Sequence, residues 1–275
     1  MFKSFIVILV LALFFPQSQT IQTPNSLTVT VNAAIKERVE VPILMYHHVG
    51  FIRNPKDALE ADLTVFPADF RREVEYFKDL GYKTVSLKEV YDALNGVGTL
   101  PAHPIVFTFD DGYADVFQYA VPILKKNGFI GTFAIATDLL GRQGYGAWSQ
   151  VTSAHNEGME IVSHTKNHLD LTSSAYSDAD LAREIKGSKA ALEDRLNTSI
   201  DFFVYPYGKF NDKIIEKLGN AGYKMALTTQ YGVWVSRNSL FTTPRVRVHG
   251  GPESLDKLKK VFEKVARTSS GRSNL

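Results

Sequence analysis

From Val41 onward the sequence alternates short runs rich in β-branched and aromatic residues with longer segments of helical periodicity. The runs expected to form strands are 41–46, 83–86, 105–109, 131–135, 159–162, 202–205 and 224–228. The segments expected to form helices are 67–80, 87–94, 114–127, 148–157, 178–196, 211–220 and 253–267. Such alternation is typical of α/β folds with parallel strands. Because the chain lacks a glycine-rich turn of the nucleotide-binding type, the pattern favours a barrel of seven parallel strands over a dinucleotide-binding sheet.

The composition suits one globular domain. Of the 275 residues, 44% are hydrophobic and 22% are charged, and the formal net charge of +2 gives no reason to expect a nucleic-acid partner. The chain has no cysteine, which excludes disulfides, a thiolate nucleophile and iron–sulfur clusters. Any bound metal must therefore use histidine and carboxylate ligands.

The N-terminus has the layout of a secretory signal. Lys3 precedes the apolar run 5–15, and Pro16 and a polar stretch follow it. Because a stable membrane-spanning helix needs roughly 20 apolar residues, a signal is favoured over a permanent anchor, with cleavage near 18–20 or near 32–34. We expect a signal peptide over 1–20, an exposed linker over 21–40, a catalytic domain over 41–268 and a flexible tail over 269–275. The protein is thus expected to be secreted or associated with the cell envelope, with no stable membrane span.

Two adjacent carboxylates, Asp110 and Asp111, follow an apolar strand where the chain turns through Gly112 into a helix. Chemistry in parallel barrels collects at the C-terminal ends of strands, and burying two carboxylates there without a function would be costly. A helix-capping role would explain one of them but not both.

Two histidines, His164 and His168, follow another apolar strand. If the segment forms a helical turn, the spacing of four residues places both rings on one side. Chance histidine pairs are common, but the position at a strand end, together with the aspartate pair, favours a metal site. Two histidines and one carboxylate leave coordination positions open, which suits Zn²⁺ or another divalent transition metal.

The metal chemistry explains why two aspartates are needed. One carboxylate binds the metal, and a second must take the proton of the attacking water. We assign Asp111 as the ligand and Asp110 as the base.

These motifs resemble those of the NodB-type polysaccharide deacetylases, the family 4 carbohydrate esterases. Residues 108–112 (Thr-Phe-Asp-Asp-Gly) match the first family motif, and residues 164–168 (His-Thr-Lys-Asn-His) match the metal motif. The resemblance covers about 41–248 and implies a distorted (β/α)7 barrel, a polysaccharide N-deacetylase activity and an N-acetylated glycan as the binding partner. Protein partners are unknown.

The third family motif is altered. Residues 204–208 read Val-Tyr-Pro-Tyr-Gly, with Val204 where the family has arginine. The resemblance implies that Pro206 and Tyr207 line the groove and that the Tyr207 N–H binds the oxyanion, although the segment could also be an ordinary turn. Arg245 and Arg247 are candidates to replace the missing arginine.

The opening strand, with His47 and His48 after it, resembles a permuted subgroup that includes biofilm poly-N-acetylglucosamine deacetylases. In that subgroup a histidine of this strand replaces the late histidine that protonates the leaving amine. The resemblance therefore makes His47 the first candidate for the general acid. His48, on the opposite face of a continuing strand, and His249, at the unpermuted position, are secondary candidates.

Trp148 and Trp234 could wall the sugar groove or could be packing residues, since aromatic faces pack well in either setting. The sequence therefore predicts metal-dependent removal of N-acetyl groups from an N-acetylglucosamine polymer of the envelope or the exterior. Peptidoglycan, poly-N-acetylglucosamine and chitin-like oligomers are the candidate substrates. The alternatives are a same-fold hydrolase of another amide or an O-acetyl ester, and a noncatalytic glycan-binding module. The presence of a base beside a metal ligand argues against the binding module.

Overall fold

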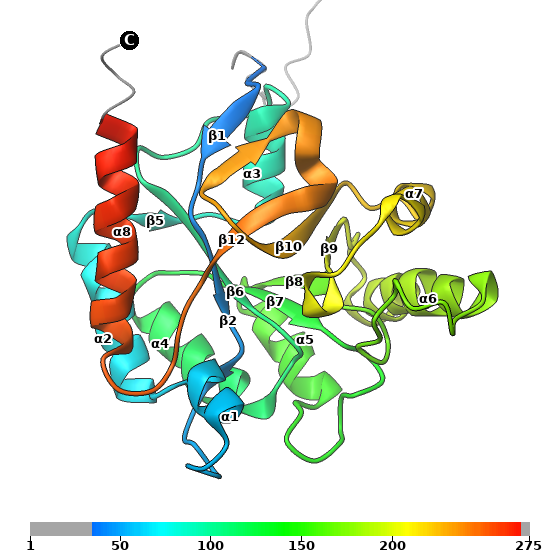
Figure 1. Ribbon diagram of the computed structural model, residues 1–275, viewed down its shortest axis with the longest axis horizontal. Helices are drawn as coiled ribbons and strands as arrows, with labels where there is room; N and C mark the ends of the chain where they lie inside the picture. Colours follow the sequence, from blue (N-terminus) through cyan, green and yellow to red (C-terminus); the bar gives the residue numbers. More distant parts are fainter. Residues whose placement is uncertain (1–34, 271–275) are drawn as a thin grey trace, which may run out of the picture. The chain divides into compact units, whose positions relative to one another are not determined.

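The computed structural model describes residues 35–270, with side chains described as far as Glu263. Seven parallel strands close into a barrel (Figure 1), and β2 pairs with both β12 and β6 to complete the ring. In spatial order they are β2 (Ile43–Tyr46), β12 (Thr243–Arg247), β10 (Met225–Tyr231), β9 (Phe202–Val204), β8 (Glu160–Ser163), β7 (Thr132–Ile135) and β6 (Pro104–Phe109). The predicted barrel of parallel strands is confirmed.

The membership of the barrel differs from the prediction in one strand. The expected strand at 83–86 is only β5 (Lys83–Thr84), which pairs with β6 at the side of the closed ring. The seventh barrel strand is β12, whose sequence Thr-Pro-Arg-Val-Arg was not among the expected strands. Proline cannot donate to a ladder and arginine is rarely buried, so β12 lacks the usual signs of a central strand.

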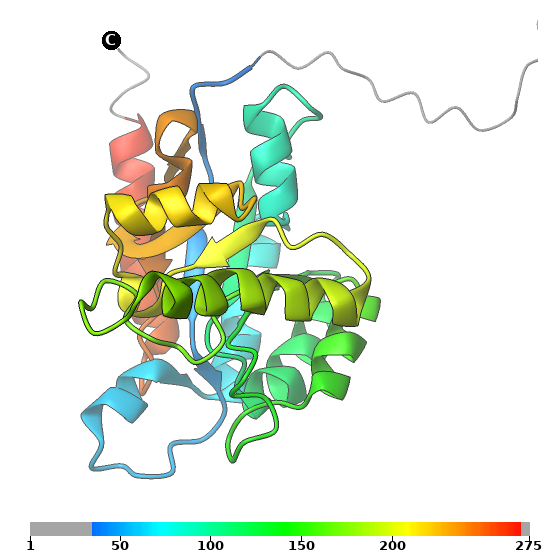
Figure 2. The same ribbon diagram turned by 90° about the vertical axis from the view of Figure 1, so that its right-hand side faces the viewer.

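The helices follow the expected pattern and cover the outside of the barrel. They are α2 (Pro67–Asp79), α3 (Leu87–Leu94), α4 (Val121–Lys126), α5 (Trp148–Asn156), α6 (Asp178–Leu196), α7 (Asp212–Asn220) and α8 (Ser254–Ser270), with a π-helical turn over Val116–Ala120 before α4. In Figure 1, α8 lies beside α2, and Figure 2 shows α6 and α7 side by side. Local signals set the helix starts: Ser86 forms a capping box with Glu89, and Ser177 forms one with Asp180.

Several short elements were not expected. The strand β1 (Arg38–Glu40) pairs antiparallel with β11 (Trp234–Ser236), and β3 (His48–Val49) pairs with β4 (Thr64–Val65). A short helix, α1 (Ala58–Leu63), precedes β4, and 3-10 turns cover Pro206–Gly208 and Arg237–Thr242.

These elements change two expected boundaries. Val39 in β1 is buried, so the expected exposed linker over 21–40 does not extend to residue 40. At the other end, α8 reaches Ser270, inside the expected tail over 269–275. The expected signal segment, 1–20, lies outside the described residues. None of the helices within residues 35–270 combines the length and apolar character that a bilayer crossing requires.

Alternation along the strands separates two apolar layers. Small or branched residues fill the barrel interior, among them Ile43, Val106, Ala134, Val162 and Val204. Their strand neighbours, such as Phe107, Phe109 and Phe133, face the helices in the larger cluster. Because side chains alternate along β6, the interior row of Val106 continues through Thr108 to Asp110. The barrel pattern itself therefore turns the Asp110 carboxylate inward.

Candidate metal centre

A cavity of about 490 Å³ opens where several barrel strands end, and it contains most of the predicted site residues. Asp110 and Asp111 follow β6, His164 follows β8, and His47 follows β2. The C-terminal ends of parallel strands meet at one end of a barrel, which explains why residues so far apart in sequence converge.

Asp111, His164 and His168 form a candidate metal centre. Their ligand atoms all lie within 4.8 Å of one another, and each imidazole Nε2 is 3.1 Å from Asp111 Oδ1. That oxygen is buried and accepts no well-directed hydrogen bond among the described residues. The 3.1 Å spacings are close to the separation of about 3.3 Å expected for two ligands of a tetrahedral zinc. The three residues therefore fit a divalent cation.

Neighbouring groups prepare these ligands for a cation. The Val204 carbonyl lies 2.7 Å from His164 Nδ1, so a proton on Nδ1 would leave Nε2 free to bind a metal. Burial alone raises the pKa of Asp111, but the neighbouring imidazoles outweigh this effect and hold the pKa well below its usual value. The Asp111 carboxylate is therefore anionic, as a ligand of a cation should be.

The segment that carries the two histidines is not the helical turn that the spacing predicted. Thr165 and His168 both have positive φ, and the chain bends between them. Thr165 Oγ1 accepts the His168 N–H at 2.9 Å, and the Glu184 carboxylate of α6 accepts both N–H groups of 166–167. The bend, and not a helical turn, brings both imidazole rings to Asp111. The prediction that the two rings lie on one side therefore holds, but for a different geometric reason.

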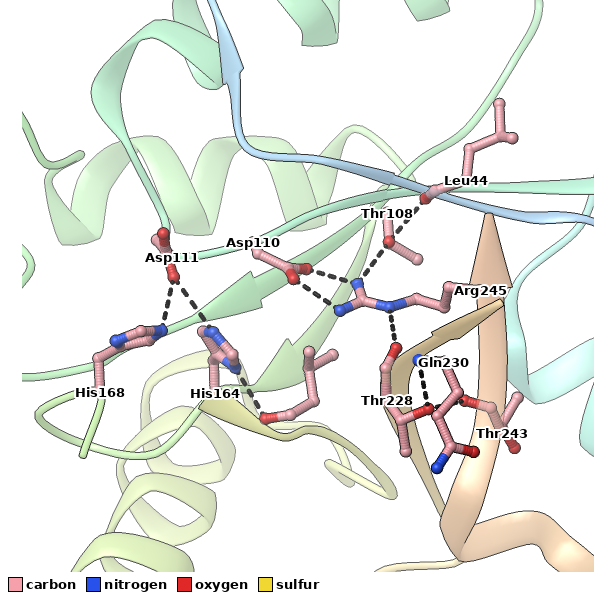
Figure 3. Close-up of polar contacts among 11 residues, drawn as sticks. Leu44, Thr108, Asp110, Asp111, His164, His168, Thr228, Gln230, Thr243 and Arg245 are labelled. Carbon is pink, nitrogen blue, oxygen red and sulfur yellow. Dashed lines mark hydrogen bonds and ion pairs between the residues drawn. The ribbon is translucent and has the colours of Figure 1, made fainter. Parts of the chain in front are cut away.

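Asp110 turns away from the metal ligands and pairs with Arg245. Figure 3 shows Asp111 directed at the two imidazoles and Asp110 directed at the guanidinium. Nη1 and Nη2 of Arg245 each lie 2.8 Å from one Asp110 oxygen, and Arg245 also donates to Thr108 Oγ1 and the Thr228 carbonyl. Burial raises the pKa of Asp110, but the guanidinium outweighs burial and the net pKa is lowered. Of the two arginines considered as replacements for the missing one, Arg245 pairs with Asp110, whereas Arg247 pairs with Asp62.

Of the three histidines considered as the acid, only His47 lines the cavity. Burial lowers the pKa of His47, although the charges of Asp110 and Asp111 partly oppose this. His48 points elsewhere, with Nδ1 2.7 Å from Asp115 Oδ2 and its ring stacked on Tyr113. His249 pairs with Asp62 at 2.8 Å, and its side chain is 48% exposed.

The altered third motif places Tyr207 at the cavity. Tyr207 has φ 59° and is 60% exposed, and its ring meets the His168 ring edge to face at 4.7 Å. Gly208 has to be glycine, because a Cβ there would lie 2.1 Å from Thr229 Oγ1. Pro206 is buried next to Tyr207 and does not itself line the cavity.

Neither tryptophan lies at this cavity. Trp148 packs on the outer core with the Arg195 guanidinium over its ring, and Trp234 in β11 carries Arg38 over its ring. The expectation that Trp148 walls the groove is therefore wrong for this cavity.

The cavity also has lining residues that the sequence did not identify, including Leu59 and Leu63 of α1, Tyr113 and Tyr145. Tyr113 directly follows the aspartate motif, so its place in the sequence could have identified it as a cavity residue. Tyr145 comes from a loop between β7 and α5, and only the folded backbone brings it to the site.

Comparisons with known proteins agree with this geometry. A family model described as polysaccharide deacetylase matches residues 98–226. The Streptococcus pyogenes deacetylase PplD, solved in complex with acetate, is 32% identical, with a TM-score of 0.72 over 80% of this chain and 97% of that one. BC0361, a polysaccharide deacetylase from Bacillus cereus, is 27% identical, with a TM-score of 0.69 over 81% of this chain and 69% of that one.

One similar protein has a named activity on a glycan. The poly-beta-1,6-N-acetyl-D-glucosamine N-deacetylase of Escherichia coli K12 is 25% identical over 252 residues, which cover 74% of this chain and 37% of that protein. The barrel, the paired aspartates and the similarity across nearly all of the streptococcal enzyme lead to one assignment. The chain belongs to the polysaccharide deacetylases, a family of hydrolases, as the sequence motifs predicted.

Proposed function

We propose that this protein is a metal-dependent enzyme that removes N-acetyl groups from an N-acetylglucosamine polymer and releases acetate. The observation that carries the proposal is the presence of two differently paired carboxylates in one cavity. Asp111 converges with two imidazoles, while Asp110 is held apart by Arg245. A binding module would need neither a second carboxylate beside the candidate ligands nor the ligands themselves.

Asp111, His164 and His168 would hold the cation, and a zinc ion suits their donor set. A divalent cation there would lower the pKa of a bound water and polarise the acetyl carbonyl. Asp110 is ionised and oriented by Arg245, so it can accept the proton of the attacking water. Tyr207, whose side chain lies at the cavity edge, is our candidate to bind the oxyanion through its backbone N–H.

His47 is our candidate for the group that protonates the leaving amine. It lines the cavity near both aspartates and His164, whereas His249 is engaged with Asp62 outside it. Its buried setting makes His47 a strong donor once protonated, because burial disfavours the imidazolium form.

The proposed substrate is a polymer of the cell envelope or the exterior. The named activity of the E. coli relative supports poly-N-acetylglucosamine, and the apolar run over 5–15 supports export. Peptidoglycan and chitin-like oligomers remain candidates, as do another amide or an O-acetyl ester as the bond that is cleaved.

The test is acetate release by the full chain from poly-N-acetylglucosamine, peptidoglycan, chitin oligomers and an O-acetylated xylan. We expect release from one of the N-acetylated glycans, and a strong loss in His47→Ala but not in the surface variant His249→Ala. Release from the xylan alone would replace the amide reaction with ester hydrolysis. Glycan binding without acetate release from any substrate would make the protein a binding module.

A further inference from the structure

Three stacked rings lead from the interior to the cavity: His48, Tyr113 and Tyr145, here called the ring stack. The His48 and Tyr113 centroids are 3.8 Å apart with planes at 22°, and those of Tyr113 and Tyr145 are 5.0 Å apart at 28°. The inner end is fixed, because His48 Nδ1 lies 2.7 Å from Asp115 Oδ2. The ring at the outer end, Tyr145, therefore packs on Tyr113, which packs in turn on the hydrogen-bonded His48.

The backbone also fixes Tyr145 in place. The loop over 141–146 lies against the turn that follows the aspartate pair, where the Ala114 N–H donates to the Gly144 carbonyl at 3.0 Å and the Gly146 N–H donates to the Gly112 carbonyl at 2.9 Å. A Cβ at Gly146 would lie 2.6 Å from the Phe117 ring, so the loop packs too closely for a side chain there. These contacts join the loop that carries Tyr145 to the turn that follows Asp111.

Tyr145 is partly exposed and lines the cavity that contains the candidate metal centre. The same cavity is bordered by Leu59, which is 63% exposed, and by Tyr207, which is 60% exposed. Aromatic and apolar side chains left open around a polar centre suit a ligand with flat apolar faces. Pyranose rings have such faces. In a polymer, another pyranose ring lies on each side of the sugar that reacts.

We infer that Tyr145 binds the sugar next to the one that is deacetylated and so selects polymer over single sugars. The inference rests on the proposed function and deepens it. Tyr145 acts by stacking, and His48 is a positioning residue that holds the ring stack through Tyr113. A ring held in place before binding loses little freedom when it takes a ligand, which makes it an effective anchor.

The test measures binding separately from turnover. Zinc-loaded Asp110→Asn protein is titrated with N-acetylglucosamine and with pentasaccharides of chitin and of poly-N-acetylglucosamine. Adding Tyr145→Ala should weaken binding of the preferred pentasaccharide about tenfold and leave the single sugar unchanged. Tyr145→Phe keeps the ring and should bind normally. Tyr231→Ala, which removes an exposed tyrosine of β10 outside the cavity, is the matched control.

In the chain with Asp110 intact, Tyr145→Ala should raise KM for the pentasaccharide while kcat stays within about twofold. Unchanged pentasaccharide binding, or an equal loss for single sugar and pentasaccharide, would overturn the inference. So would a fall in kcat accompanied by weaker zinc binding, because that pattern indicates a purely structural role. If the unaltered chain releases no acetate but Tyr145 still governs pentasaccharide binding, the proposed function fails and the sugar site stands.

Discussion

The Arg245 guanidinium meets the Asp110 carboxylate inside the barrel with both oxygens paired at 2.8 Å, and Arg245 is almost fully buried. The pair joins β12 to the end of β6, strands that are far apart in sequence. In this chain Val204 stands where the third family motif has arginine. The guanidinium beside Asp110 comes instead from Arg245, on a different strand. The orientation of the proposed base therefore depends on the strand that the sequence pattern did not reveal.

Replacing Arg245 should reduce the free energy of unfolding. Arg245→Met leaves Asp110 buried without its partner, which we expect to cost about 3–5 kcal/mol in the free energy of unfolding. Adding Asp110→Asn should restore much of that loss, because the unpaired charge is removed. Urea unfolding checks both variants, with the exposed pair variant Arg183→Met as a control that should change stability by less than about 1 kcal/mol. Equal stability of Arg245→Met and the unaltered chain would contradict the role of the pair.

The buried carboxyl of Glu73 should make stability depend on pH. Burial raises the pKa of Glu73 from 4.5 to about 7, although Tyr46 donates to Oε2 at 3.0 Å. An unfolded chain releases this proton at lower pH than the folded one, so stability should fall as the pH rises from 4.5 through 7. The raised pKa corresponds to a loss of about 3 kcal/mol in the free energy of unfolding over this pH range.

Glu73→Gln should remove that loss, and unfolding by urea across this pH range measures it. Glu75→Gln, an exposed change on the same helix, is the matched control. An equally steep fall in stability in Glu73→Gln would show that another group is responsible.

The turn that carries Tyr207 should not tolerate a side chain at Gly208. Its φ is +68°, and a Cβ would lie 2.1 Å from Thr229 Oγ1 and 2.7 Å from the Thr229 nitrogen. Gly222 also has a positive φ, +84°, but has open space around a Cβ. We expect Gly222→Ala to cost about 1 kcal/mol from backbone strain alone, and Gly208→Ala to cost clearly more and to reduce acetate release. Thermal unfolding of both variants separates strain from clash, and equal losses would rule out the clash.

The Glu184 carboxylate should govern zinc affinity without touching the metal. It holds the bend between His164 and His168 through two backbone N–H groups and the Asn167 side chain. Glu184→Ala should weaken zinc binding about 10–100-fold, as is typical for groups that orient ligands. Asp194→Ala, an exposed change on the same helix, should leave zinc affinity unchanged. Competition with a chromogenic chelator measures both, and unchanged affinity in Glu184→Ala would contradict the role of the bend.

Much of the fold could be read from the sequence because its signals are local. Alternating strands and helices predicted the parallel barrel, and the helix expected over 178–196 has those observed bounds, Asp178–Leu196. Strand ends predicted where Asp110, Asp111 and His164 would meet, because the C-terminal ends of parallel strands share one end of a barrel.

The remaining features depend on contacts between distant segments. Pro244 and two arginines make the sequence of β12 unlike that of a central strand. The burial of Arg245 is explained by its partner Asp110, which is distant in the sequence. Tyr145 reaches the cavity through backbone hydrogen bonds to the turn after the aspartate pair, which no local pattern encodes. Trp148 looked suitable by residue type but lies on the first turn of α5, packed on the outer core.

The central claim is that hydrolysis of the acetyl amide requires both a divalent cation, which Asp111, His164 and His168 would hold, and Asp110 as the base. The most direct test strips the protein with a chelator, returns zinc in steps, and records bound zinc and acetate release from the preferred glycan, beside Asp110→Asn. We expect release to rise in proportion to zinc up to one equivalent, while Asp110→Asn binds the same equivalent and releases almost nothing. Full activity in the stripped protein, or undiminished release by zinc-loaded Asp110→Asn, would contradict the account.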